Sequence, residues 1–134
     1  MWRVVSHVVS RLLLGAFVIA VAGIAGSRGG LPAGPRPPQA VTIEMTARRF
    51  AFIPDRVKVV EGDHVTLAVR SADGTHGIEI KKLKIRQDIP RGGSVVTVAF
   101  TAPAPGNYDI VCSEYCGRGH NDMKATLVVI PRTD

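Results

Sequence analysis

From residue 41 onward, apolar and polar side chains alternate along the chain with a period of two. The alternation runs through residues 41–46, 64–70, 95–100, 108–112 and 125–129. A period of two is typical of a β-strand that buries one face, whereas an amphipathic helix repeats about every 3.6 residues. No stretch after residue 40 offers ten residues of helical periodicity. The pattern therefore predicts an all-β domain.

Turn-forming residues separate the predicted strands. Glycine, proline, asparagine or aspartate occurs in each of the segments 61–63, 72–74, 91–93 and 105–107, and such residues favour tight turns. About seven short strands at regular spacing are typical of a sandwich or barrel. We therefore expect residues 41–134 to form a single β-sandwich or barrel domain.

A hydrophobic segment precedes the predicted domain. Residues 12–26 are apolar or small, and Arg3 and Arg11 stand before them. A basic region followed by about 7–15 apolar residues is typical of a secretory signal, and an N-terminal extension of the run would make a single membrane anchor. We expect residues 1–26 to be one or the other. Residues 27–40 read as a Gly/Pro-rich linker, and the rest of the chain is expected to be exported.

The charge of the chain is unevenly distributed. The net charge is +6, and residues 1–39 contribute four arginines and no acidic residue. Residues 40–134 carry the other 13 basic residues and all 11 acidic residues, so the predicted domain is nearly balanced. This distribution suits a leader at a membrane better than nucleic-acid binding, which favours a basic patch on the folded domain. We therefore expect no nucleic-acid partner.

Four side chains with metal-ligand chemistry lie in one segment between two predicted strands. They are Cys112, Cys116, His120 and Met123, and His76 follows a glycine-containing turn earlier in the chain. A loop held between strands can bring such side chains to one point. Thiolate, thioether and imidazole ligands together favour copper, above all where Cu(I) must be held.

Simpler interpretations of these residues exist. Two cysteines in an exported protein often form a disulfide, and two cysteines with two histidines can hold zinc. Met123 has no use in zinc binding and favours copper. A mononuclear blue-copper site needs one cysteine, two histidines and a weak methionine, which leaves Cys112 unexplained. A second copper ion would give both thiolates a role, because each can bridge two metals.

One segment resembles the CuA site of cytochrome c oxidase subunit II. It reads Cys-Ser-Glu-x-Cys-Gly-x-x-His-x-x-Met at residues 112–123, with His76 upstream. Residues 50–54, 61–63 and 73–77 resemble other cupredoxin segments of that family more weakly. The resemblance implies a Greek-key β-sandwich of cupredoxin type that binds two copper ions in a binuclear centre. It implies six ligating residues: His76, Cys112, Glu114, Cys116, His120 and Met123.

The same resemblance implies a role for each ligand. The two cysteines would bridge the two copper ions. His76 and Met123 would bind one ion, while His120 and the backbone carbonyl of Glu114 would bind the other.

The resemblance also implies a function. In that family, the copper pair accepts single electrons from cytochrome c or another small electron carrier and passes them to the haem-copper oxidase subunit I. We therefore expect an electron-transfer subunit that is not catalytic alone. It would be membrane-attached or secreted at the periplasmic, outer face of the cytoplasmic membrane. The chain has at most one hydrophobic segment, as in the short single-helix members. The alternatives are a stand-alone exported cupredoxin that stores or delivers copper, and a structural β-sandwich without metal.

Overall fold

The computed structural model describes residue 34 and residues 36–133. The hydrophobic segment at residues 1–26, expected to be a signal or an anchor, lies outside the described residues, as does most of the expected linker. Among the residues described, no helix has the length and apolar character needed to cross a membrane.

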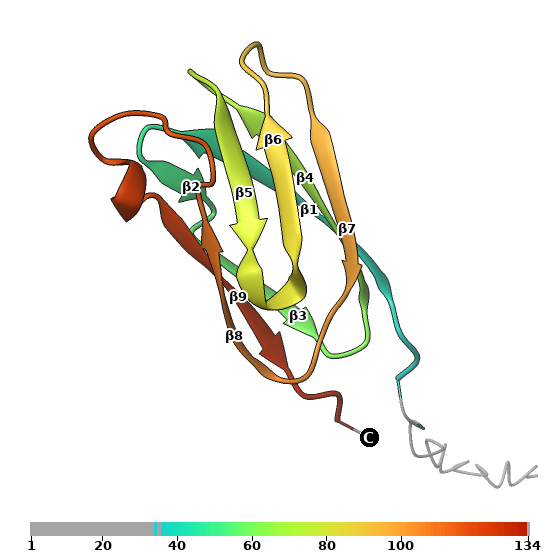
Figure 1. The fold of residues 1–134 in the computed structure, drawn as a ribbon. Helices are drawn as coiled ribbons and strands as arrows, with labels where there is room; N and C mark the ends of the chain where they lie inside the picture. Colours follow the sequence, from blue (N-terminus) through green and yellow to red (C-terminus); the bar gives the residue numbers. More distant parts are fainter. Residues whose placement is uncertain (1–33, 35, 134) are drawn as a thin grey trace, which may run out of the picture. The chain divides into compact units, whose positions relative to one another are not determined.

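Two β-sheets make up the fold (Figure 1). The first has four strands in the order β2-β1-β4-β7, and the second has five in the order β3-β9-β8-β5-β6. The strands of the first sheet are β1 Ala40–Arg48, β2 Ala51–Ile53, β4 His64–Ser71 and β7 Val96–Thr101. The strands of the second are β3 Arg56–Val60, β5 His76–Ile80, β6 Ile85–Ile89, β8 Gly106–Val111 and β9 Lys124–Ile130. Two short 3-10 turns, η1 Lys81–Leu83 and η2 His120–Asp122, complete the regular elements of the described chain.

Strands that follow one another along the chain often belong to different sheets, so the chain crosses between the two sheets several times. Strand β1 pairs with β4, and β3 with β9, in parallel, whereas the other pairs are antiparallel. The five alternating runs seen in the sequence fall on β1, β4, β7, β8 and β9. The predicted all-β sandwich is therefore confirmed.

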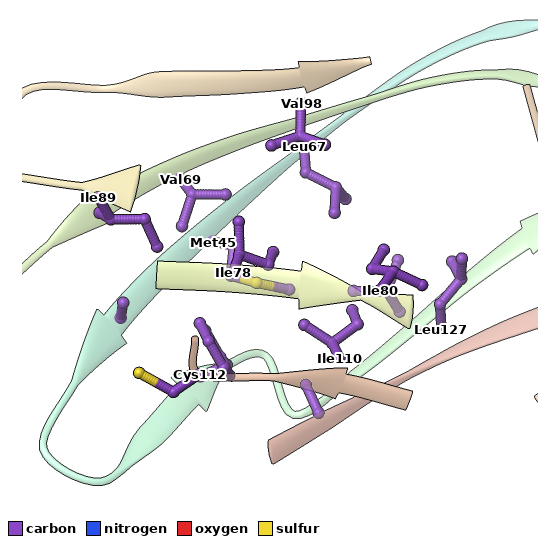
Figure 2. Close-up of a cluster of buried hydrophobic side chains, with 14 of the residues drawn as sticks. Met45, Leu67, Val69, Ile78, Ile80, Ile89, Val98, Ile110, Cys112 and Leu127 are labelled. Carbon is purple, nitrogen blue, oxygen red and sulfur yellow. The ribbon is translucent and has the colours of Figure 1, made fainter. Parts of the chain in front are cut away.

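The alternating apolar side chains fill the space between the sheets. Val65, Leu67 and Val69 of β4 are at most 1% exposed. Figure 2 shows Leu67 and Val69 in one cluster with Ile78 of β5 and Leu127 of β9 from the other sheet. Burying a Val or Leu side chain contributes about 1.5–3 kcal/mol. A shift of β4, β5 or β9 by one residue would turn these apolar side chains toward solvent. The core therefore fixes the register of both sheets.

An ion pair closes one end of the sandwich. Arg132 follows β9, and its Nη2 lies 2.7 Å from Oδ1 of Asp63, in the turn before β4. The same guanidinium donates to the backbone carbonyls of Arg36 and Pro37, at 2.8 and 3.1 Å. The amide of Gln39 donates to the Asp63 carboxylate at 2.9 Å. The residues just before β1 are therefore hydrogen-bonded to the domain.

Three connections meet at the opposite end, in the upper left of Figure 1. They are residues 49–50 between β1 and β2, residues 72–75 between β4 and β5, and residues 112–123 between β8 and β9. Hydrogen bonds from the first connection reach both of the others. The last two connections lead into or contain all the ligands expected from the sequence.

Candidate metal centre

The loop at residues 112–123 is closed at its base by the β8–β9 ladder. Val111 pairs with Lys124, and the amide of Cys112 donates to the carbonyl of Met123 at 3.2 Å. Cys112 and Met123 are buried, at 6% and 0% exposed. Because side chains alternate along a strand, the inward faces of β8 and β9 direct the first and last ligand candidates of the loop into the protein.

Three sulfur atoms gather in the buried part of this loop. Sγ of Cys112 lies 3.9 Å from Sγ of Cys116, which lies 3.8 Å from Sδ of Met123. Nδ1 of His120 is 3.9 Å from the Cys116 sulfur. A metal ion binds a thiolate at about 2.3 Å, so one ion can contact both cysteines at this separation. Both cysteines are free thiols, which disfavours the disulfide considered from the sequence.

His76 brings an imidazole to the same point from the first residue of β5. The ring is fully buried, and one ligand atom each from His76, Cys112 and Cys116 lie within 4.8 Å of one another. Nε2 of His76 is 2.7 Å from Oδ1 of Asp73. Nδ1 is buried without a hydrogen-bond partner. An unpaired buried polar atom costs about 1–3 kcal/mol, and a metal ion held with the two thiols would satisfy it.

Asp73 is the hydrogen-bond partner that orients the imidazole of His76. Its carboxylate accepts hydrogen bonds from the amides of Arg49 and Gly74, at 2.8 and 2.6 Å, as well as facing His76. Burial raises the pKa of Asp73, but these hydrogen bonds outweigh burial and lower the pKa to about 2. Asp73 is therefore ionised at neutral pH, so its Oδ1 is the acceptor in the contact with Nε2 of His76. Nδ1, the other ring nitrogen, is the one left for a metal, as in carboxylate–histidine–metal triads.

Glu114 offers two different groups in two directions. Its backbone carbonyl lies 3.2 Å from Sγ of Cys112, which donates to it. Its carboxylate lies 2.9 Å from Nη2 of Arg86 on β6, and the same nitrogen donates to the carbonyl of Ser113 at 3.0 Å. The carbonyl therefore faces the sulfur atoms, while the carboxylate is occupied at the surface.

The Cys116 thiol is protonated at neutral pH in the absence of a metal. Burial raises the pKa of Cys116 to about 11, and the neighbouring Cys112 adds to this shift. A metal must therefore displace protons as it binds.

Two glycines make room for the loop. A Cβ at Gly77 would overlap the hydroxyl of Ser113 and lie 3.1 Å from the amide nitrogen of Glu114. A Cβ at Gly119 would overlap the ring of Phe50, which packs against the loop from the first connection. Glycine at these positions lets β5 and Phe50 come close to the 112–123 loop.

One side of the loop is open to solvent. Tyr115 is 76% exposed, and its ring centroid lies 5.7 Å from that of His120, which is half-buried. A cavity of about 460 Å³ reaches Cys112, His120 and Met123. Its rim carries the charged residues Glu79, Lys81, Arg86 and Lys124. The candidate ligands Cys112 and Met123 are thus buried, and the cavity connects them and the half-buried His120 to the surface.

Comparison with known sequences assigns the family. A model of the cupredoxin-like domain matches residues 15–129. Two cytochrome c oxidase subunit 2 sequences from Thermus thermophilus are each 34% identical to the chain over 92 residues, or 69% of the chain. The chain belongs to the cytochrome c oxidase subunit 2 family. The alignment spans 67% of one of these relatives and 54% of the other, so this chain corresponds to about half to two thirds of their length.

Solved structures of cytochrome oxidase subunit 2 relatives share the fold. A cryo-EM structure of a heme-copper terminal oxidase dimer matches 71% of this chain and 74% of its own matched chain, with a TM-score of 0.60 and 26% identity. The periplasmic domain of subunit II of cytochrome oxidase from Bradyrhizobium japonicum matches 71% of this chain and 87% of that one, with a TM-score of 0.61 and 19% identity. At 19% identity the second likeness supports the fold alone. The cupredoxin type of sandwich and the family expected from the sequence are confirmed.

Some residues of this site were not identified from the sequence. The sequence places Asp73 in a turn and in the family-like segment 73–77 but predicts no contact with His76, and it predicts no role at the site for Arg49 or Arg86. The Asp73-Gly-Thr-His76 spacing was an available signal, because a carboxylate three residues before a histidine in a turn can reach its ring. Nothing in the local sequence of Arg49 indicates its contact with Cys116, which is 67 residues away.

Proposed function

We propose that this domain holds a binuclear copper centre and transfers single electrons through it. The ligands are two bridging thiolates, two imidazoles, one thioether and one backbone carbonyl, from Cys112, Cys116, His76, His120, Met123 and Glu114. The observation that carries this proposal is the pair of free buried thiols 3.9 Å apart, with the imidazole of His76 within 4.8 Å of both and one of its ring nitrogens unpartnered.

The donor set favours copper over zinc. Met123 is fully buried, with its sulfur 3.8 Å from the Cys116 sulfur, and a thioether suits Cu(I) and has no place in structural zinc sites. Two buried thiols side by side also exceed what a mononuclear blue-copper site uses. A pair of ions bridged by both thiolates employs every donor of the cluster.

The proposed division of ligands is the one that the resemblance to the CuA site implies. The carbonyl of Glu114 is on the Cys112 side of the cluster, at 3.2 Å from that sulfur. His120 and Met123 approach Cys116, at 3.9 and 3.8 Å. We assign His76 and Met123 to one ion, and His120 with the Glu114 carbonyl to the other.

The protein around the cluster suits one-electron exchange. Copper bound there would alternate between oxidation states that differ by one electron. Asp73 holds the His76 ring, and the paired ends of β8 and β9 hold Cys112 and Met123. Ligands fixed from outside the cluster move little when its charge changes, which keeps reorganisation small.

The subunit context is proposed from the relatives. Those relatives are named as subunit 2 of cytochrome c oxidase, and one solved relative as a periplasmic domain. We propose that the domain faces the periplasm, receives electrons from a cytochrome c-like carrier and delivers them to a haem-copper subunit I. The exposed ring of Tyr115 lies beside the half-buried His120, and we propose this part of the loop as the point of electron entry.

Copper reconstitution tests this proposal. The full chain is loaded with copper, and the metal-to-protein ratio and electron paramagnetic resonance spectrum are recorded. Two coppers per chain with a seven-line hyperfine pattern are expected for one electron shared over two nuclei. A single weakly held Cu(I) would favour the storage or delivery protein instead. No copper uptake, with both thiols oxidised, would leave a structural sandwich.

A further inference from the structure

Arg49 contacts both segments that carry the proposed ligands. It lies in the two-residue connection between β1 and β2. Its backbone amide donates to Oδ2 of Asp73 at 2.8 Å, and its side-chain Nε donates to the carbonyl of Cys116 at 2.9 Å. Asp73 in turn holds the imidazole of His76. Arg49 is thus hydrogen-bonded both to the carbonyl of Cys116 and to Asp73, the partner of His76.

The guanidinium of Arg49 is also seated on the backbone of Gly74. A Cβ at Gly74 would lie 3.1 Å from Nη2, 3.5 Å from Cζ and 3.8 Å from Nε of Arg49. The side chain of the exposed residue Arg49 therefore lies between the 72–75 turn and the Cys116 carbonyl. The absence of a side chain at position 74 is what gives it that space.

We propose that Arg49 is a positioning residue for the copper centre, and this inference rests on the proposed function. Its side chain fixes the Cys116 carbonyl, and hence the Cys116 thiolate, relative to the turn that presents His76. The amide contact to Asp73 survives any substitution other than proline, because it uses the backbone alone. Changing the side chain therefore isolates the bond to Cys116.

The chain supplies a matched control in the preceding residue. Arg48 has the same charge, is exposed at the end of β1, and makes no side-chain hydrogen bond or ion pair within the described part of the chain. We expect Arg49→Gln to lower copper affinity about tenfold, at the low end of the range for residues that orient metal ligands. It should also change the copper hyperfine pattern, whereas Arg48→Gln should leave both unchanged. Equal effects of the two substitutions would overturn the proposal.

A second variant separates geometry from charge. Arg49→Lys keeps the positive charge but replaces the planar guanidinium with a single ammonium, so we expect it to behave like Arg49→Gln. Wild-type affinity and spectrum in Arg49→Lys would show that charge alone suffices, against the proposal. Gly74→Ala should disturb the hydrogen bond between Arg49 and the Cys116 carbonyl by crowding the guanidinium. Because both changes act on one contact, the double variant should lose no more than the larger single effect, and additive losses would contradict the assignment.

A copper-free measurement keeps this test independent of the proposed function. In the metal-free protein, nuclear magnetic resonance can follow exchange of the arginine Nε–H protons with solvent. The Nε–H of Arg49 should exchange at least tenfold more slowly than that of Arg48, because it is bonded to the Cys116 carbonyl. Equal exchange rates would refute the positioning role even if copper binds. Slow exchange in a protein that binds no copper pair would instead count against the proposed function alone.

Discussion

The imidazole of His76 and the carboxylate of Asp73 are joined by a 2.7 Å contact, and the ring nitrogen that does not make it is buried without a partner. This relationship leaves Nδ1 of His76 without a partner in a ring that has a ligand atom within 4.8 Å of both thiols. It makes Asp73 the residue that orients a proposed ligand without touching the metal.

Asp73→Asn should weaken copper binding about 10- to 100-fold, the usual cost of losing a partner that orients a metal-bound histidine. The amide group cannot accept hydrogen bonds at both former carboxylate oxygens, so the imidazole loses part of its support. Copper affinity measured by competition with a chelator checks this expectation. Asp88→Asn, at an exposed aspartate of β6, is the control. Equal affinities in the two variants would contradict the role of Asp73.

The pKa of Cys116, raised to about 11 by burial and by Cys112, predicts slow thiol chemistry in the copper-free protein. The rate at which iodoacetamide alkylates Cys116 should rise about tenfold per pH unit between pH 8 and 10, because only the thiolate reacts. Apparent copper affinity should rise with pH as well, since binding releases the thiol protons. The chain unfolded in urea serves as the reference, with a plateau expected near its ordinary thiol pKa. A plateau at pH 8 in the folded protein would rule out the predicted shift.

Gly77→Ala should disturb the loop without removing a proposed ligand. The added methyl group overlaps the Ser113 hydroxyl and crowds the Glu114 amide, so the Glu114 carbonyl is displaced from its place beside Cys112. Overpacking of this kind costs about 1–3 kcal/mol of stability. We expect a lower copper-to-protein ratio and a lower thermal midpoint. Gly34→Ala, where a Cβ has no neighbour within 4 Å, should change neither, and wild-type copper content in Gly77→Ala would contradict the crowding argument.

Met123→Leu should retain two coppers per chain but change their reduction potential. A weak thioether ligand tunes such a site more than it builds it. Leucine fills nearly the same volume, so the stability loss should stay below about 1.5 kcal/mol. Met45→Leu replaces another buried methionine, 2% exposed in the core, and should leave the potential unchanged. Complete loss of copper in Met123→Leu alone would refute the tuning role.

Asp63→Asn should destabilise the domain at the end away from the loop. Arg132 would lose its charged partner, and a hydrogen bond to a charged group contributes about 1.5–3 kcal/mol. Hydrogen bonds from the Gln39 amide and Arg132 lower the pKa of Asp63 below its ordinary value of 3.8. A depressed folded-state pKa means that the stabilisation is present above that value and is lost as the pH falls below it. Urea unfolding at pH 7, 4 and 3 should therefore show a steeper acid loss in the native protein than in Asp63→Asn. The exposed Asp55→Asn should follow the native profile, and identical profiles in all three would exclude the effect.

The sequence predicted the parts of this molecule that depend on local spacing. The period-two runs predicted the longer strands, and the spacing of Cys112, Cys116, His120 and Met123 indicated one ligand-bearing loop. Strand β2 has three residues, too few for a period to be visible. The contacts of Arg49 with Asp73 and Cys116 span 24 and 67 residues. Such contacts depend on which strand ends meet in space, and no local pattern encodes them.

The hydrogen bonds of Arg132 to the carbonyls of Arg36 and Pro37 hold both ends of the described chain at one end of the sandwich. The 112–123 loop lies at the opposite end (Figure 1). A surface linker attached at Thr133 would leave from that same end of the domain. A protein immobilised on an electrode in this way would present Tyr115 and His120 toward the solution, where a soluble redox partner can reach them.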